Sequence, residues 1–325
     1  MTDAPSASPF EDIRALAASV PERDDSAYKA VQERSDTLGR GLDPLGTLVA
    51  PLSRFAAVQG AMQPRLARPL VAVFTASHGV SDGSVDGAKA RVASLSDGAC
   101  AVRGVAQDAG AAFKVYEFGL DYPSADFRQG PSLSERDCAA AIAFGMEVVA
   151  EGAELVVLGN AGFGAATAAA AVARGLYGGS AEYWASGSGD IAEARREAVS
   201  AGARANSELL SDPLHTLRAF GGRDMAGTVG AILACAHQRV PVILDGYVVC
   251  AAAAVVHAVN PRAIAHCVAG HVSAEPAHAA LLERMDLDPV LQMGVGIGDG
   301  TGGALALKLL QAANAGLNTL SPDTV

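Results

Sequence analysis

Charged, aromatic and cysteine residues are all scarce in this chain of 325 residues. Only 18% of the residues are charged and 5% are aromatic, whereas half are hydrophobic. This composition excludes a disordered chain and predicts a large packed core. The five cysteines are an odd number without CxxC spacing, which argues against a disulfide framework and favours a reducing cytoplasm.

Basic residues are outnumbered by acidic ones, 24 to 35, which gives a net charge of −11 and a pI near 5.1. Nucleic acids and anionic membranes attract basic surfaces, so we expect neither as a partner. A bound phosphate would have to be held locally, by backbone amides or by a few arginines.

Long hydrophobic runs are missing as well. The most apolar stretch, Val248 to Val259, contains His257 and is shorter than the ~20 residues that a spanning helix needs. The first residues include Asp3, Glu11 and Asp12 instead of a basic region followed by an apolar core, so we expect no secretory signal. These absences predict a soluble, cytoplasmic protein.

Helix signals dominate the first 60 residues. Ser8-Pro9-Phe10-Glu11 combines an N-cap serine, a first-turn proline and a glutamate that reaches back to the cap, which predicts a helix to about Pro21. Two more helices are expected, from Ser26 to Leu38 and from Leu45 to Gln59. From Pro69 onward short apolar strands alternate with helices, which is the pattern of βαβ units.

The predicted fold is therefore α/β: a parallel, Rossmann-like sheet with helices on both faces. Residues 1–60, joined by about 304–325, are expected to form a smaller helical lobe, and residues 61–303 the α/β core. The apolar runs expected to be strands are Leu70 to Thr75, Ala112 to Phe118, Leu155 to Leu158, Pro241 to Leu244 and Ala263 to Val268. The clearest helices between them are Ser134 to Val149, Thr167 to Leu176, Ile191 to Leu210, Pro213 to Phe220 and Met225 to His237.

Three glycine-rich turns lead into helices, and ligands of open α/β sheets bind where strands end and helices begin. The first turn, Gly159 to Thr167, allows a close approach of the backbone and offers helix N-terminal amides to a phosphate. The second, Ser186-Gly187-Ser188-Gly189, precedes Arg195 and Arg196, whose guanidinium groups neutralise phosphates well. Taken alone, the first turn could be free of ligand and the second could be a flexible linker.

The third turn, Ile297 to Gly303, contains a single carboxylate, Asp299, which by itself is more typical of a helix N-cap than of a catalytic acid. A fourth candidate is the Ser77-His78-Gly79 turn, which follows the first predicted strand and is well placed for ligand contact. Four residues near the C-terminus could suggest zinc, but their spacing matches no zinc motif, so we expect no metal. They are His266, Cys267, His271 and His278.

These turns resemble, in order, those of the nicotinate-nucleotide:dimethylbenzimidazole phosphoribosyltransferases of cobalamin assembly, and the resemblance extends from the first helix to Asn318. Ser77-His78-Gly79-Val80 corresponds to the family's Asp-His-Gly-Val, and Gly159 to Thr167 corresponds to its Gly-Glu-Met-Gly-Ile-Gly-Asn-Thr-Thr. Ser186 to Gly189 corresponds to its Gly-Arg-Gly-Thr-Gly loop. Further matching segments are Asp212-Pro213-Leu214 with Gly221-Gly222, Arg239 to Tyr247, His271 to His278 and Ile297 to Gly302.

The resemblance implies an enzyme that moves the phosphoribosyl group of nicotinate mononucleotide to 5,6-dimethylbenzimidazole or a related aromatic base, giving α-ribazole phosphate. It implies a homodimer that uses no cofactor. It assigns proton acceptance to Asp299 and base binding to Ser77, His78 and Asn160. The residues that it assigns to phosphate and ribose are Gly162, Gly164, Thr167, Ser186, Gly187, Ser188, Gly189, Arg196 and Ser273.

The chain departs from the family pattern in the turns that would perform the chemistry. Asn160 stands in place of the family's glutamate, Ala165 and Ala166 replace an Asn-Thr pair, and Asp299 is one methylene shorter than the family's acid. Two functions therefore stay open. One is an active transferase whose acceptor base could differ, and the other is a catalytically impaired member that binds a nucleotide or base, or pairs with an active relative.

Overall fold

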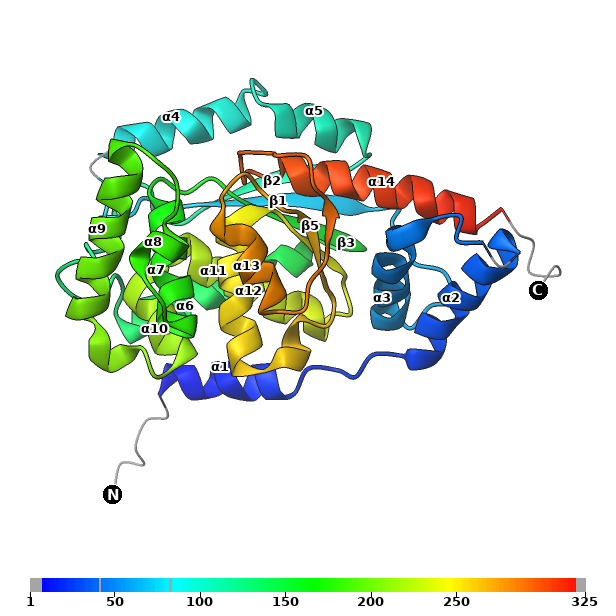
Figure 1. The fold of residues 1–325 in the computed structure, drawn as a ribbon, viewed down its shortest axis with the longest axis horizontal. Coiled ribbons are helices and arrows are strands. Elements are labelled where there is room, and N and C mark those ends of the chain that lie inside the picture. The colour runs from blue at the N-terminus through cyan, green and yellow to red at the C-terminus, as the bar shows by residue number, and fades with distance from the viewer. Residues whose placement is uncertain (1–7, 41, 82–83, 320–325) are drawn as a thin grey trace, which may run out of the picture.

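The structure is a computed structural model and describes residues 8–40, 42–81 and 84–319. Over these residues six parallel strands form one sheet in the order β2-β1-β3-β4-β5-β6 (Figure 1). The strands are β1 (Pro69–Thr75), β2 (Ala112–Glu117), β3 (Leu155–Asn160), β4 (Val242–Leu244), β5 (Cys267–His271) and β6 (Pro289–Leu291). The predicted α/β class with a parallel sheet is confirmed.

Helices connect the strands and cover the sheet on both faces. The α-helices are α1 (Pro9–Ala18), α2 (Asp25–Gly39), α3 (Val49–Gln59), α4 (Ser84–Ser96), α5 (Ala101–Asp108), α6 (Glu135–Gly145), α7 (Ala165–Tyr177), α8 (Ala181–Trp184), α9 (Asp190–Ala205), α10 (Pro213–Phe220), α11 (Gly222–His237), α12 (Gly246–Val259), α13 (Ala277–Glu283) and α14 (Thr301–Leu317). Short 3-10 turns lie at Gly46–Leu48, Met146–Glu151, Ser207–Leu209 and Pro261–Ile264.

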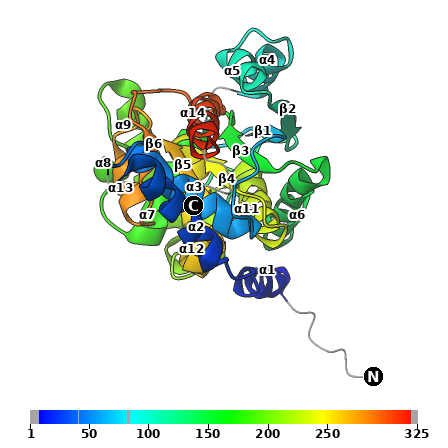
Figure 2. The same cartoon turned by 90° about the vertical axis from the view of Figure 1, so that its right-hand side faces the viewer.

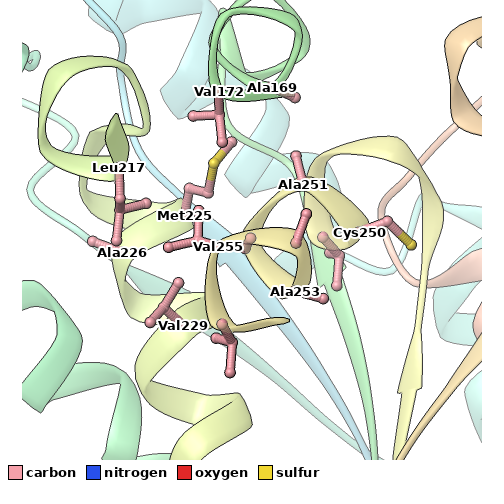
Figure 3. Packing of buried hydrophobic residues seen from close by; sticks show 14 of the residues in the cluster. Ala169, Val172, Leu217, Met225, Ala226, Val229, Cys250, Ala251, Ala253 and Val255 are labelled. Atoms are coloured by element: carbon pink, nitrogen blue, oxygen red, sulfur yellow. The ribbon is translucent and has the colours of Figure 1, made fainter. Parts of the chain in front are cut away.

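Side chains of β1 alternate between two hydrophobic clusters, one on each face of the sheet. Leu70, Ala72 and Phe74 pack with the alanine-rich helices α7, α11 and α12, and Figure 3 shows the interior of this larger cluster. Val71 and Val73 point the other way and pack with α2, α3, α5 and α14. Because both faces are covered, β1 needs apolar residues on both sides, which is why it reads as a continuous apolar run as far as Phe74.

The first three helices do not pack as one unit in the described residues. α1 lies against α6 and α12, whereas α2 and α3 pack on each other and contact α14. α14 also lies along the sheet, against β3 and β5. Residues 1–7 and 320–325 lie outside the described residues, and the division into a helical lobe and an α/β core stays a prediction.

The strand predicted at Ala263 to Val268 is wrong over its first four residues, because the strand begins only at Cys267. Asn260 accepts a hydrogen bond from the backbone N–H of Arg262 at 3.1 Å, and Pro261 follows it, so the chain turns as a 3-10 helix here. The short edge strand β6 was not predicted. Its three residues are half-buried and carry no long apolar run, which leaves no pattern to detect.

Helices α4 and α5 stand apart from the bulk of the molecule, above β2 and α14 (Figure 2). α4 contributes Ala88 and Val92 to a small cluster with Leu120, and Leu95 to the cluster that α5 joins through Val102 and Ala106. Within residues 8–40, 42–81 and 84–319, no helix has the length and hydrophobicity needed to cross a membrane.

Candidate active site

The carboxyl ends of β1, β3, β4 and β5 meet along one edge of the sheet. From β1 the chain goes to β2 on one side and then returns to β3 on the other, so the strand order reverses between β1 and β3. Ligands of open parallel sheets bind at such a reversal, outside the carboxyl ends of the strands. The predicted turns after β1 and β3 therefore lie at the position that favours binding.

The turn after β1 is joined to the turn after β3 by backbone hydrogen bonds. The His78 N–H donates to the Phe163 carbonyl at 3.1 Å, and the Phe163 N–H donates to the Ala76 carbonyl at 3.0 Å. The Ser77 hydroxyl donates to the Leu120 carbonyl at 2.8 Å. Ser77 and His78 are both buried, so their side chains brace this edge from inside the protein.

A buried polar network lies behind the two turns. The Asp224 carboxylate, on α11, contacts His78 Nε2 at 2.9 Å through Oδ1 and accepts from Asn160 Nδ2 at 2.9 Å through Oδ2. The Met225 N–H also donates to Oδ1, at 2.9 Å. Burial alone would raise the pKa of Asp224, but the imidazole and the hydrogen bonds outweigh it, and the pKa lies below its ordinary value.

The network fixes the first glycine turn. Asn160 Oδ1 accepts from the Gly162 N–H at 2.8 Å, so one amide side chain links the carboxylate of α11 to the backbone of the turn. A Cβ at Gly162 would lie only 2.0 Å from Asp224 Oδ2, so only glycine fits there. The sequence did not single out Asp224. Its signal was a lone carboxylate next to the long apolar run that begins at Met225.

The first turn ends in the N-terminus of α7. Gly164 is the N-cap, with a φ of 92° that disfavours other residues, and it provides no side-chain cap. The Thr167 N–H is bonded to the Gly164 carbonyl at 3.1 Å, whereas the preceding amides of Ala165 and Ala166 have no intrahelical acceptor. Free amides and the positive end of a helix dipole form an anion-binding site.

Two buried carboxylates, Asp245 and Asp299, hold the third turn in place. Asp245, which follows β4, accepts from the Gly300 N–H at 2.7 Å and the Gly303 N–H at 2.5 Å and so anchors the start of α14. His271 Nε2 lies 3.1 Å from Asp245 Oδ1. Burial would lower the pKa of His271, but the Asp245 carboxylate outweighs burial and raises it.

Asp299 precedes α14 and is only 3% exposed. Its Oδ1 accepts from Thr301 Oγ1 at 2.6 Å and from the Thr301 N–H at 3.2 Å. The N-cap of α14 is Gly300 and not Asp299, so the N-cap reading of Asp299 is wrong. Oδ2 receives no hydrogen bond from a described residue. The neighbouring Gly298 carbonyl accepts from the Asn160 N–H at 2.7 Å, which ties this turn to the first one.

A cavity of about 370 Å³ lies between these turns. It is large enough for a small ligand and combines backbone, polar and apolar groups. Its lining consists of Arg91, Asn160, Gly162, Ala165, Ala166, Gly246, Tyr247, Val248, Ser273, Ala274, Glu275, Pro276, Gly296, Ile297 and Gly298. The structure thus brings together the predicted residues Asn160, Gly162 and Ser273, with Asp299 next to the wall at Gly298.

Ser273 is held by the buried His278. The Ser273 N–H donates to His278 Nδ1 at 2.9 Å, and the Ser273 hydroxyl lies 3.0 Å from the same nitrogen. Burial lowers the pKa of His278 to about 3, so the ring is neutral and its Nδ1 accepts. Within the described residues, no three side chains of the types that bind metals come together.

The second glycine turn lies away from this cavity, because none of Ser186 to Gly189 is in its lining. Arg196 donates to the Gly187 carbonyl at 3.2 Å and so stays with its own turn. Arg195 points toward the cavity wall instead: it donates to Glu275 Oε2 at 3.1 Å and to the Ala166 carbonyl at 3.3 Å. Arg91 and Glu275 were not predicted as site residues, and Arg195 was considered only with Arg196, as an arginine that follows the second turn.

Comparison with known proteins agrees with this geometry. Residues 20–322 match the family model described as a phosphoribosyltransferase, DBI_PRT. The nicotinate-nucleotide–dimethylbenzimidazole phosphoribosyltransferase of Sinorhizobium medicae is 43% identical over 318 residues, which cover 94% of this chain and 93% of that protein. The protein of the same name from Brucella anthropi is 41% identical over 316 residues, with the same coverage. The chain belongs to this phosphoribosyltransferase family.

A solved structure supports the same assignment. The crystal structure of the enzyme of that name from Thermus thermophilus superposes with a TM-score of 0.84 at 30% identity, covering 92% of this chain and 97% of that chain. The predicted family and fold are thus confirmed, and the chain is an enzyme of the phosphoribosyltransferase type. The assignment of individual site residues stays a prediction.

Proposed function

We propose that this phosphoribosyltransferase moves the phosphoribosyl group of nicotinate mononucleotide to 5,6-dimethylbenzimidazole or a related aromatic base, in the assembly of cobalamin. The observation that carries the proposal is the cavity at the carboxyl edge of the sheet, which joins the free amides of α7 to the turn that holds Asp299. One end suits a phosphate and the other suits proton acceptance. The names of the relatives support the choice of substrates.

In the proposed reaction a nitrogen of the incoming base attacks C1′ of the ribose as the bond to nicotinate breaks. The bonding electrons leave with the pyridine nitrogen, which becomes neutral, and C1′ is inverted to give α-ribazole phosphate. The second nitrogen of the base loses its proton to Asp299. The Thr301 hydrogen bonds to Oδ1 orient that carboxylate, and Oδ2 is the oxygen left for the proton.

The other residues bind and position. Gly162, Gly164 and Thr167 shape the start of α7, where the free Ala165 and Ala166 amides receive the 5′-phosphate, and Ser273 faces the ribose from the opposite wall. Asn160 contacts the base. Ser77 and His78, which are buried behind the wall, keep the β1 and β3 turns in register rather than reaching the base themselves.

The test incubates the purified protein with nicotinate mononucleotide and a panel of benzimidazoles, purines and phenols, and measures nicotinate release. Release that depends on an added base supports the transfer reaction and identifies the acceptor. Mononucleotide binding without any release of nicotinate would favour the alternative, a catalytically impaired family member. The observation behind this alternative is that Asn160, Ala165 and Ala166 stand where the family has an acid and two hydrogen-bonding residues.

We further propose that the protein is a homodimer in a reducing cytoplasm. All five cysteines are free thiols in the structure, and four of them are buried, which suits a compartment without disulfide formation. Sedimentation equilibrium of the full chain tests the dimer, since a monomer mass of 32.8 kDa is clearly distinguishable from twice that value.

A further inference from the structure

Helix α4 contributes one basic residue, Arg91, to the lining of the cavity. Arg91 lines the cavity together with Asn160, Gly162, Ala165 and Ala166, which lie between the end of β3 and the start of α7. α4 is seated on that turn, because Phe163 packs against the small cluster to which α4 contributes. Arg91 therefore approaches the same wall that carries the free amides of α7.

No acidic side chain among the described residues balances the charge of Arg91. Among the described residues Arg91 has neither an ion pair nor a hydrogen-bond partner. The other arginine at this wall, Arg195, is paired with Glu275 at 3.1 Å, and Lys89, two residues before Arg91, is paired with Asp121. The chain has a net charge of −11, so acidic partners for a guanidinium are plentiful. An arginine left unpaired at a cavity wall is therefore well suited to bind an anionic ligand.

We propose that Arg91 is a specificity-determining residue that binds the 5′-phosphate of the substrate beside the N-terminus of α7. The amides of Ala165 and Ala166 supply hydrogen bonds but only a partial charge, and Arg196 is occupied with the Gly187 carbonyl. Arg91 supplies the full positive charge and a planar pair of donors that match a phosphate. The inference rests on the proposed function in taking a mononucleotide as the substrate, but it does not depend on the transfer step.

The carboxylate of nicotinate is the other anion that the substrate would bring into the cavity. Four probes separate the two sources: ribose 5-phosphate has only the phosphate, nicotinate riboside has only the carboxylate, nicotinate mononucleotide has both, and nicotinamide mononucleotide keeps the phosphate but has a neutral amide. Isothermal titration of each probe into the full-length protein measures affinity without requiring turnover.

We expect Arg91→Gln to reduce the affinity for the three phosphate-bearing probes by about 10- to 100-fold, as for the loss of a charge-assisted hydrogen bond. The affinity for nicotinate riboside should stay unchanged. Arg91→Lys should recover part of the affinity, because it keeps the charge but loses the paired donors. Lys89→Gln is the matched control: it removes the same charge from the same helix and should change no affinity. Thermal melting of all variants checks that α4 remains folded.

Three results with the variants would overturn the proposal. They are an unchanged affinity for ribose 5-phosphate in Arg91→Gln, a loss confined to the two probes that carry the nicotinate carboxylate, or an equal loss in Lys89→Gln. Absence of ribose 5-phosphate binding by the parent would overturn it too. Failure of the nicotinate-release assay while ribose 5-phosphate still binds through Arg91 would refute the transfer reaction alone.

Discussion

The wall behind the first glycine turn and the turn before α14 each contain a buried aspartate, but the two carboxylates are bound differently. Asp224 uses both oxygens, and its partners His78 and Asn160 come from two other elements of the sheet edge. Among the residues that the structure describes, Asp299 is bonded only to Thr301, two residues away, and only through Oδ1. A carboxylate whose oxygens are all engaged positions its neighbours, whereas one with an oxygen to spare is able to take a proton.

The largest effect is expected from Asp299→Asn, which removes the charge but keeps an oxygen that accepts from Thr301. If Asp299 is the general base, base transfer should fall by about 10²- to 10⁴-fold. The free energy of unfolding should change by no more than ~1 kcal/mol, and mononucleotide binding should stay close to that of the parent. Single-turnover transfer, urea unfolding and titration calorimetry measure the three quantities. Undiminished transfer would remove Asp299 from the mechanism.

Asp224→Ala tests the other carboxylate, and its main effect should be on stability. Removing one member of a buried, hydrogen-bonded charge network typically costs about 3–5 kcal/mol, because His78 and Asn160 lose their shared partner. Urea unfolding should show a loss of that size, and the matched change at the exposed Asp12 should cost less than about 0.5 kcal/mol. Equal stability of the two variants would mean that the network does not brace the site.

Asp299→Glu tests whether the length of this acidic side chain limits the transfer reaction. Glutamate is the acid that the family resemblance places here, and the shorter Asp299 carries its carboxylate more than ~1 Å away from that position, an error that can cost about 100-fold. We expect the variant to transfer phosphoribose to dimethylbenzimidazole about 10- to 100-fold faster than the parent. A slower variant would indicate that the backbone of this chain already places the shorter acid correctly, and that its acceptor base is the natural one.

Buried histidines should make the protein sensitive to acid. Burial lowers the pKa of His278 to about 3 and that of His266 to about 4. Between pH 6.5 and these values the unfolded chain binds more protons than the folded one, so stability falls as the pH falls. Each of these two histidines should lower the free energy of unfolding by about 2 kcal/mol between pH 6.5 and pH 5. His271, whose pKa is raised, contributes stability below pH 6.5 that is lost at higher pH, and so opposes part of the effect.

Urea unfolding at pH 7.5, 6.5 and 5.0 measures this dependence. His278→Gln keeps an acceptor for the Ser273 N–H but cannot be protonated, so the loss between pH 6.5 and 5 should shrink by about half. The matched change near the end of α12, His257→Gln, should leave most of the loss in place, because His257 is only partly buried. An unaltered slope in His278→Gln would show that other groups control acid unfolding.

Much of the fold could be predicted because local signals and tertiary structure agree. Pro213–Phe220 has a capping aspartate, a first-turn proline and a terminal glycine, and the helix has those bounds in the structure. β1 and β3 are covered on both faces, so their residues are buried throughout and are apolar up to Thr75 and Asn160 at their carboxyl ends. β6 has no such signal, since it lies at the edge and pairs only through Pro289 and Leu291.

The candidate site was less predictable, because contacts between distant segments define it. Nothing local distinguishes Asp224 from an ordinary first-turn acid of α11, since its partners lie 146 and 64 residues away in the sequence. Arg91 is equally inconspicuous in the sequence of α4. The glycine turns could be found from the sequence, whereas the side chains that complete the cavity had to be found from the fold.

The smallest effect is expected for the arginines that follow the second glycine turn. Arg195 and Arg196 are neighbours in helix α9. About 100° of rotation separates adjacent helical residues, so the two guanidinium groups point to different places. Arg196 donates to the Gly187 carbonyl, outside the cavity lining, and its change to glutamine should raise the KM for nicotinate mononucleotide by less than about 3-fold.

Arg195→Gln is the matched comparison, and it should raise the same KM by about 5- to 10-fold. Its loss leaves Glu275 at the cavity wall without its ion-pair partner, and a nearby unpaired carboxylate repels the substrate's phosphate. Steady-state kinetics of both variants at about 0.15 M salt measure the ratio. A larger effect at Arg196 would mean that Ser186 to Gly189 closes onto the phosphate when substrate binds, as the family resemblance implies, and that this turn then belongs to the site after all.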